Sequence, residues 1–593
     1  MNYRVKSLLL LTLLALALAP ADAQRRSKAK KKAKPVAKTT KKTTASKTVS
    51  KETVKPRPAE AADTQMRDGL GDTTAPRVVT VTSAFKPSLR SAAKINFTAA
   101  SPLVDTSRTA VLYQIPSQNL LFSYQPVPIK PLALPVDTGF NWQNDHFVKF
   151  GVGNFNSVLG EAAFSFGDGV KNSTIVHGNF ETAKGDLFAQ QYGNLGLDIT
   201  SVFNTANHNE WTAKAWYKNT TRYFYGFEPS TLSFTKEDIR QRFNNVGIEL
   251  GLRNKAANAF RITYAPKVNL RYFSDNRENK ELQAILDAPL RKQFGDHVAI
   301  DLGIMADLSN TSIRLIPNSL SLKNNLVYVS PSVQYNSGAF RLNLGIRPSW
   351  DNGSFATLPN ISAEARIGDA GVVAEAGWIG SYQKNTYRTL SDYNPWVGAP
   401  VGLLNTKINE QYAGLRGSAG NHFTYQARLS FLRLNNQPLF PNSGGDGKSF
   451  TVVYEPSMDI VQVHGEVGYT LQEKLSLLAG ITYKQFTSLQ QYEKAWGIPP
   501  LEVTGTLRWK LLKDLQLKAD AFIWDGSHYR DRTGSTRKLD PAADINLGAE
   551  FSVMPKLNLW VQLNNVLNNK YRRWNQYEVM GLNVLGGIVY SFR

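Results

Sequence analysis

The chain of 593 residues contains no cysteine. This absence excludes disulfide bonds, thiolate zinc sites, a cysteine nucleophile and a lipidated N-terminal cysteine. Beyond its N-terminal segment, the sequence also lacks any apolar stretch of the ~18 residues that a membrane-spanning helix requires. We therefore expect no membrane helix in the mature protein.

Motifs for catalysis are equally scarce. The seven histidines show neither H-x-x-x-H nor H-E-x-x-H spacing, and no G-x-S-x-G sequence is present. These patterns would bring metal ligands together on one helix or present a serine nucleophile on a sharp turn. We expect no metal, no cofactor and no enzymatic activity.

The net charge of +22 is concentrated near the N-terminus. Between Arg25 and Pro58 there are fourteen Lys or Arg residues and a single acid, Glu52. The basicity therefore belongs mostly to a tail, and it does not indicate a nucleic-acid-binding surface.

The first residues have the pattern of an export signal. Residues 1–23 have a basic start, an apolar run from Leu8 to Leu18 and an A-x-A ending, which predicts cleavage between Ala23 and Gln24. Export argues against a cytoplasmic enzyme and against nucleic acid as a partner.

Residues 24–76 are rich in Lys, Ala, Thr, Ser and Pro and have almost nothing to bury, so we expect a disordered tail. Two interpretations remain open for it. It is a solvated tether, or it binds an anionic surface such as membrane phosphates, cell wall, or a periplasmic or outer-membrane protein.

Residues 77–140 form a separate segment with a β-prone start and several prolines. Too few apolar residues recur for an independent core. We expect extended chain that lies against the periplasmic rim of a barrel or enters its lumen.

The last third, from about Ile460 to Phe592, reads as seven strands of about ten residues. In Leu501–Leu511, every second residue is Leu, Val, Gly or Trp, and the alternate positions hold Glu, Thr, Arg and Lys. Because side chains alternate faces along a strand, such a segment has one apolar wall and one charged wall. Its length suits a tilted strand that crosses a bilayer.

The connections between these strands also alternate. Short turns are predicted at Gln472–Lys474, Lys513–Asp514 and Met554–Lys556, and long polar loops near 487–500, 525–541 and 567–580. A soluble sandwich does not ordinarily place a long loop at every second connection. The pattern is typical of an outer-membrane barrel.

Alternating runs begin near His146 and continue to the end of the chain. Counting them predicts an all-β fold, a transmembrane antiparallel β-barrel of about 22 strands over residues 141–593. The weakest candidate strand is Thr311–Pro317, and its omission together with a partner gives 20.

The closing hairpin carries a resemblance. Asn564–Tyr571 with Trp574 and Tyr577, followed by Tyr590-Ser591-Phe592, resembles the C-terminal end of TonB-dependent receptors. The resemblance implies an outer-membrane transporter with a 22-stranded barrel plugged by an N-terminal domain.

The segment 77–140 is short for such a plug. Phe85–Leu89 with Ala93–Asn96, and later Phe150–Asn154, are similar to a plug-less group of receptor-like outer-membrane proteins. That likeness implies a barrel without a full plug, in contact with outer-membrane lipid and lipopolysaccharide, with its N-terminal segment in the periplasm.

Two sets of side chains are candidate functional residues. If the apolar faces meet lipid, charged residues on the opposite faces line the lumen and bias which solutes pass, or they pair with each other or with the N-terminal segment. These are Lys149, Arg428, Arg508, Lys510, Lys518 and Asp520. Loop aromatics could contact a ligand, although we favour an interfacial girdle for them. These are Tyr393, Trp396, Trp496, Tyr571 and Trp574.

Two functions follow as hypotheses. The first is a porin-like or receptor-like transport barrel that lacks a full plug. The second is a structural or assembly subunit of an outer-membrane complex, with a closed lumen and a basic periplasmic anchor.

Overall fold

The computed structural model describes residues 144–593, apart from 206–207, 316 and 369–370. The predicted signal peptide, its cleavage at Ala23 and Gln24, the basic tail and the segment 77–140 lie outside the described residues.

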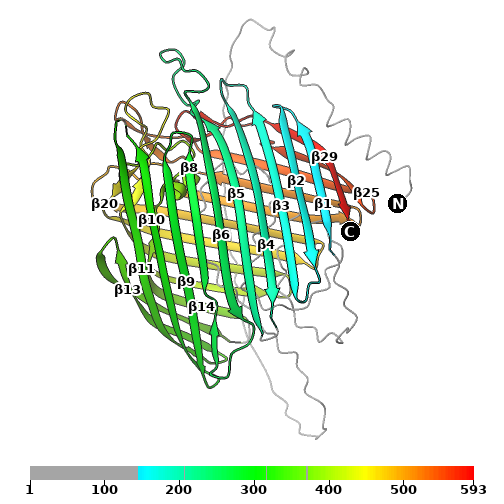
Figure 1. The fold of residues 1–593 in the computed structure, drawn as a ribbon, viewed down its shortest axis with the longest axis vertical. Coiled ribbons are helices and arrows are strands. Elements are labelled where there is room, and N and C mark those ends of the chain that lie inside the picture. Colours follow the sequence, from blue (N-terminus) through cyan, green and yellow to red (C-terminus); the bar gives the residue numbers. More distant parts are fainter. Residues whose placement is uncertain (1–143, 206–207, 316, 369–370) are drawn as a thin grey trace, which may run out of the picture. The chain divides into compact units, whose positions relative to one another are not determined.

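Most of the described chain forms one antiparallel sheet that closes on itself (Figure 1). Three two-stranded sheets lie within three of its connecting loops. The first strand, β1 (His146–Gly153), pairs with β2 (Ser157–Gly167) on one side and with the last strand, β29 (Asn583–Phe592), on the other. The register at this closure is unbroken and begins with His146 opposite Phe592. The sheet therefore has no free edge at the point where the two ends of the barrel chain meet.

The barrel has 22 strands, as the alternating runs predict. The segments β7 (Ile262–Tyr264) and β8 (Lys267–Asp275) both pair with β9 (Lys280–Phe294) and form one interrupted strand of the wall. The other wall strands are β3 (Asn172–Lys184), β4 (Gln191–Asn204), β5 (Asn209–Tyr223), β6 (Arg240–Asn254), β10 (Val298–Arg314), β11 (Ser319–Asn336), β12 (Phe340–Asp351), β13 (Ser354–Ile367), β14 (Val372–Gln383), β15 (Thr406–Ala419), β16 (Phe423–Asn435), β19 (Met458–Leu471), β20 (Leu475–Leu489), β21 (Leu501–Leu512), β22 (Leu515–Trp524), β25 (Ala542–Met554) and β26 (Leu557–Asn564).

The prediction of a separate strand at Thr311–Pro317 is wrong. Residues 311–314 are the end of β10, which has 17 residues, and the following strand β11 has 18. Both strands continue beyond the length needed to cross a bilayer, so their polar ends mimic the alternation of another strand.

The two faces of the wall differ in the way that the alternation predicts. On β1, Phe150 and Val152 are 52% and 53% exposed, whereas Lys149, which precedes Phe150, is 4% exposed. The same alternation places Ile588 outward on β29, the neighbour of β1, and Leu250 outward on β6. A continuous surface of exposed aliphatic and aromatic side chains is stable only against hydrocarbon, so the outer face is a membrane-facing surface.

Connections at one end of the barrel, which we call the turn side, are short. They include 168–171, 295–297, 472–474, 513–514 and 555–556, and the three turns predicted in the last third are confirmed. Both His146 and Phe592 lie at this end, because β1 begins and β29 ends there.

Connections at the opposite end, the loop side, are mixed. The long loops predicted in the last third are confirmed as 490–500, 525–541 and 565–582, and 224–239, 384–405 and 436–457 join them. The other loop-side connections are short. At Asn352 and Gly353 both φ angles are positive (50° and 87°), as a two-residue hairpin turn requires.

The loop 384–405 contains a short helix, α2 (Tyr387–Tyr393). Thr386 is its N-cap and shares reciprocal hydrogen bonds with Thr389, a capping box that fixes the start of the helix. Within the described residues, no helix has the length and apolar character needed to cross a membrane.

Candidate functional site: the closed loop side of the barrel

Loops from distant parts of the chain meet at the loop side in one apolar cluster, which we call the loop core. It joins residues of the long loops to the inward faces of β6, β8 and β10. Its buried members are Phe243, Phe273, Ile313, Tyr387, Leu390, Val397, Leu403, Phe440, Phe450, Trp574 and Tyr577. Because these residues come from different sectors of the wall, their packing bridges the mouth of the barrel.

Aromatic rings hold the loop core together. Trp396 stacks on Tyr577 with a distance of 3.9 Å between ring centroids and an interplanar angle of 24°. Trp574 makes edge contacts with Phe440 at 5.5 Å and with Phe450 at 5.2 Å. Each aromatic pair adds about 0.5–1.5 kcal/mol beyond the apolar area that it buries.

Hydrogen bonds fix the same loops to one another. The Trp396 indole donates to the Tyr223 carbonyl at 3.1 Å, and the Tyr225 hydroxyl donates to the Glu578 carbonyl at 2.8 Å. The Tyr577 hydroxyl donates to the Lys448 carbonyl. The loops 224–239, 436–457 and 565–582 are thus bonded to one another as well as packed.

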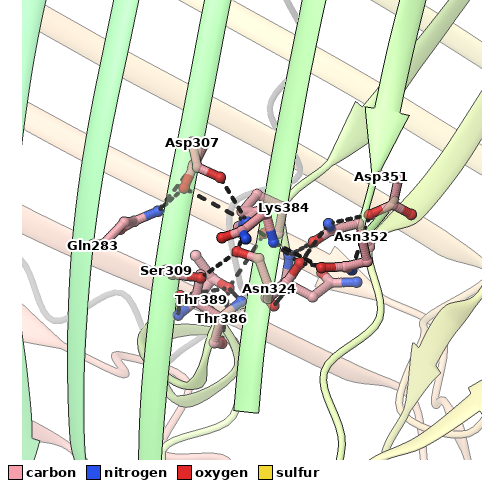
Figure 2. Close-up of polar contacts among 12 residues, drawn as sticks. Gln283, Asp307, Ser309, Asn324, Asp351, Asn352, Lys384, Thr386 and Thr389 are labelled. Atoms are coloured by element: carbon pink, nitrogen blue, oxygen red, sulfur yellow. Dashed lines mark hydrogen bonds and ion pairs between the residues drawn. The ribbon is translucent and has the colours of Figure 1, made fainter. Parts of the chain in front are cut away.

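A polar network, the anchor, ties the loop 384–405 to the wall (Figure 2). The Lys384 ammonium donates to the carbonyl of Asp307 at 3.0 Å and to that of Asn324, and lies 3.7 Å from the Asp307 carboxylate. Gln283 donates to both oxygens of that carboxylate at 2.9 and 3.0 Å. Burial lowers the pKa of Lys384, whereas the charge of Asp307 raises it.

The same loop is held by a second group of buried acids. The Glu281 carboxylate accepts the backbone N–H of Tyr387 at 2.7 Å and the hydroxyl of Thr311 at 2.9 Å. The Tyr387 hydroxyl donates to Asp275 at 2.7 Å. Burial, and then the neighbouring Asp275 charge, raise the pKa of Tyr387 well above its usual value, so the hydroxyl stays a donor.

Asparagines complete the anchor. Asn405 donates to Asn324 at 2.7 Å and to Asp351 at 2.7 Å. Asn324 donates to the Asn385 carbonyl at 2.8 Å, and Asn352 donates to Asn324 at 3.1 Å. Both ends of the loop 384–405 are therefore bonded to Asn324 of β11, and Asn405 is also bonded to Asp351 at the end of β12.

Four of the predicted lumen charges gather in one part of the wall, on β21, β22 and β1. Lys149 lies over the Trp560 ring at 4.4 Å from its centroid. Lys518 shares a small cavity with Lys149 and Glu550. Arg508 pairs with Asp520 at 3.1 Å. These charges point away from the lipid-facing surface and mostly face one another.

The other two predicted lumen charges lie apart. Arg428 donates to Glu375 at 2.6 Å and lies over the Tyr412 ring at 4.2 Å. Arg416 also pairs with Glu375, at 3.2 Å. Lys510 is exposed and lies close to the turn 513–514.

The predicted loop aromatics are distributed over three apolar clusters. Trp574 belongs to the loop core, with Tyr393 and Trp396 packed against it. Trp496 and Tyr571 belong to adjacent clusters. Trp496, Tyr571 and Trp574 are at most 8% exposed, so the interpretation as a lipid-exposed girdle is wrong for these three.

Sequence reasoning missed the anchor altogether. Lys384, Glu281 and Asn324 are ordinary polar residues in their local sequence, and the hydrogen bonds that they form between the loop 384–405 and the wall join residues 60 or more positions apart. No spacing rule connects them. The one available signal was the Thr386–Thr389 capping box, which indicates a helix start inside the loop.

Comparisons with known proteins reveal a similarity of fold to solved structures but no match to a family model or a curated protein.

Solved structures of outer-membrane receptors match the fold. The FrpB iron transporter of Neisseria meningitidis has a TM-score of 0.59 at 11% identity, covering 77% of this chain and 82% of that one. The siderophore receptor PirA of Acinetobacter baumannii has 0.59 at 8%, covering 76% and 80%. The pyoverdine outer membrane receptor FpvA of Pseudomonas aeruginosa has 0.58 at 13%, covering 75% and 78%. The described chain thus has a closed 22-stranded barrel similar to that of TonB-dependent siderophore receptors, as the resemblance of its closing hairpin implied.

Proposed function

We propose that this protein is an outer-membrane transport barrel that passes small or medium solutes and is closed at its loop side in this structure. The lipid-facing surface and the receptor-like barrel support the location and the class. The printed names of its structural neighbours describe transporters and receptors of iron compounds, and we propose no catalytic role for this chain.

The observation that carries the proposal is the loop core together with the anchor. A loop that was only a surface connection would not place a lysine between buried wall residues, because a buried charge is costly unless it is paired. Here Lys384 and Tyr387 are held by wall carboxylates of Asp307, Glu281 and Asp275. The loop 384–405 behaves as a gate that has a defined closed position.

The ends of the barrel chain support an orientation. His146 and Phe592 lie together on the turn side. We propose that the turn side faces the periplasm, where the basic residues between Arg25 and Pro58 would contact the cell wall or a periplasmic partner.

Planar-bilayer recording tests the gate. Purified wild-type protein is expected to show small or rare single-channel currents, because the loop core bridges the mouth. Lys384→Met removes the charge and keeps the length of the side chain, and larger and more frequent openings are expected. Lys171→Met, in the turn 168–171, is the matched control and should behave as the wild type.

Equal currents from wild-type and Lys384→Met protein would contradict the gate. No current from either, with both correctly folded, would contradict a transport barrel.

The second hypothesis is a structural or assembly subunit, and the bridged mouth favours it too. It predicts no current in any variant and the loss of co-purifying envelope proteins when residues 25–58 are deleted. Deletion with no change in partners or envelope integrity would exclude it.

A further inference from the structure

The wall is not uniformly paired around the barrel. Between β13 and β14 the ladder runs from Ile367 opposite Val372 to Asn360 opposite Ile379 and ends there. On the loop side of this point, Ser354–Pro359 pairs with β12 alone. The facing residues Gly380–Gln383 pair with β15 alone. The two strands part over the loop-side half of the wall, and we call this opening the seam.

The local sequence accounts for the seam. Pro359 has no N–H to donate at the point where pairing stops. Gly380 lies so close to Leu358 that an added Cβ would come within 2.6 Å of the Leu358 Cβ. On the lumen side, Arg347 donates to the Gly380 carbonyl at 2.7 Å and satisfies a group that the ladder leaves free.

On the outer face, a groove of about 490 Å³ follows the seam. Its volume lies within the range of ligand sites, roughly 300–1,000 Å³. Its apolar part is built by outward residues that are well exposed, among them Ile346, Ile361 and Trp378. The groove therefore opens toward the lipid, not toward the lumen.

Polar side chains line the loop-side end of the groove. Lys407 lies at the start of β15, and no ion pair of Lys407 is found among the described residues. Arg433 is held by Asp459 through two bonds of 2.7 and 3.1 Å, which orient its guanidinium. Trp378 donates to Asn409 at 2.6 Å.

We propose that the groove binds a lipid of the loop-side leaflet whose headgroup carries phosphomonoesters and a net negative charge, with one acyl chain along Ile346, Ile361 and Trp378 and a phosphomonoester at Lys407 and Arg433. Three observations select this occupant. The groove faces lipid, its apolar part is lined by outward side chains, and its polar end carries two cations against one carboxylate near the loop-side ends of β15 and β16. A parted strand pair in a bilayer also requires something that covers it, because exposed backbone groups there are costly.

This inference concerns the outer surface and stands independently of transport through the lumen. Detergent-purified full-length protein is titrated with bisphosphorylated lipid A and, separately, with zwitterionic phosphatidylethanolamine, and bound lipid is counted by native mass spectrometry. Wild-type protein is expected to bind lipid A at one saturable site and phosphatidylethanolamine at least tenfold more weakly.

Two variants separate the charge from the shape. Lys407→Gln combined with Arg433→Gln is expected to weaken lipid A binding by about tenfold or more, because both cations that attract the anionic headgroup are removed. Thr357→Trp keeps both cations but fills the outward side of the groove, and binding should fall by a similar factor. The control is Lys323→Gln, an exposed lysine on the outward face of β11 at the same end of the barrel and outside the groove, which should not change binding.

The proposal is overturned if both lipids bind wild-type protein equally, or if Lys323→Gln weakens binding as much as the double variant. It is also overturned if millimolar inorganic phosphate alone displaces the lipid, or if Thr357→Trp binds as the wild type. Folding of each variant is checked by heat-modifiable gel migration, and the two-lipid comparison on wild-type protein remains decisive if a variant does not fold.

Discussion

The two ends of this barrel are connected in different ways. At the turn side, the polar groups of a short connection form hydrogen bonds with residues of the same turn. Asp168, for example, accepts the backbone N–H groups of Val170, Lys171 and Asn172 within one turn. At the loop side, long segments are held by residues from elsewhere in the chain, such as Trp396 against Tyr577. Local sequence therefore specifies one end, and tertiary packing specifies the other.

Removing an aromatic ring from the loop core should have the largest effect, because it weakens the tertiary packing that holds the loop side. Tyr577 is 2% exposed, and Tyr577→Ala should destabilise the closed loops by about 3–5 kcal/mol, the usual cost of truncating a large buried aromatic residue. Limited proteolysis of folded barrel checks this, with faster cleavage expected in the long loops.

The matched control for that variant is Tyr335→Ala. Tyr335 is 42% exposed on the outer face near the turn side, and its removal should leave loop cleavage unchanged. Equal cleavage rates for the two variants would show that the loop core does not hold the loops.

A smaller effect is expected for the anchor. Tyr387→Phe leaves the buried Asp275 carboxylate without its hydroxyl donor, which costs about 1–3 kcal/mol. Because burial raises the pKa of Tyr387, the contribution of its protonated hydroxyl should persist at pH 10 and be lost only at higher pH. Loop proteolysis between pH 8 and 11 measures the effect of the substitution and its pH dependence. Faster cleavage of the wild-type loops at pH 10 than at pH 8 would contradict the buried hydrogen bond.

Charge reversal in the lumen should change selectivity and leave the gate unchanged. In a Lys384→Met background, Arg508→Glu combined with Lys510→Glu should shift the preference of the current from anions toward cations, because charged groups inside a pore bias ion passage. Reversal potentials in a salt gradient measure this shift. An unchanged reversal potential would show that these residues do not line the conducting path.

The smallest effect is expected at the turn side. Backbone donors, first that of Asn172, lower the pKa of Asp168, and the side chain is fully exposed to solvent. Asp168→Asn should therefore alter neither loop proteolysis nor channel current. A clear change in either would mean that the two ends of the barrel are coupled.

The wall could be predicted from the sequence because its signals are local. The run Leu501–Leu511 corresponds to β21 (Leu501–Leu512) almost residue for residue, since alternation and a short turn suffice to define a strand. The prediction failed at Thr311–Pro317 because a long strand that leaves the membrane continues to alternate.

The site could not be predicted because its contacts are not local. Alternation along the strand predicts that Arg428 points inward, but its partner Glu375 is 53 residues away. The sequence shows aromatic residues in the loops, but their burial follows from loops folding over the mouth. The helix α2 is too short for a periodicity signal.

Hydrogen–deuterium exchange of the loop 384–405 shows directly whether the loop side is closed. We expect the backbone amides of Leu390 and Asn394, which are bonded within α2 and its cap, to exchange as slowly as amides of the wall strands. Exchange at the rate of an unstructured peptide in wild-type protein would contradict a closed loop side.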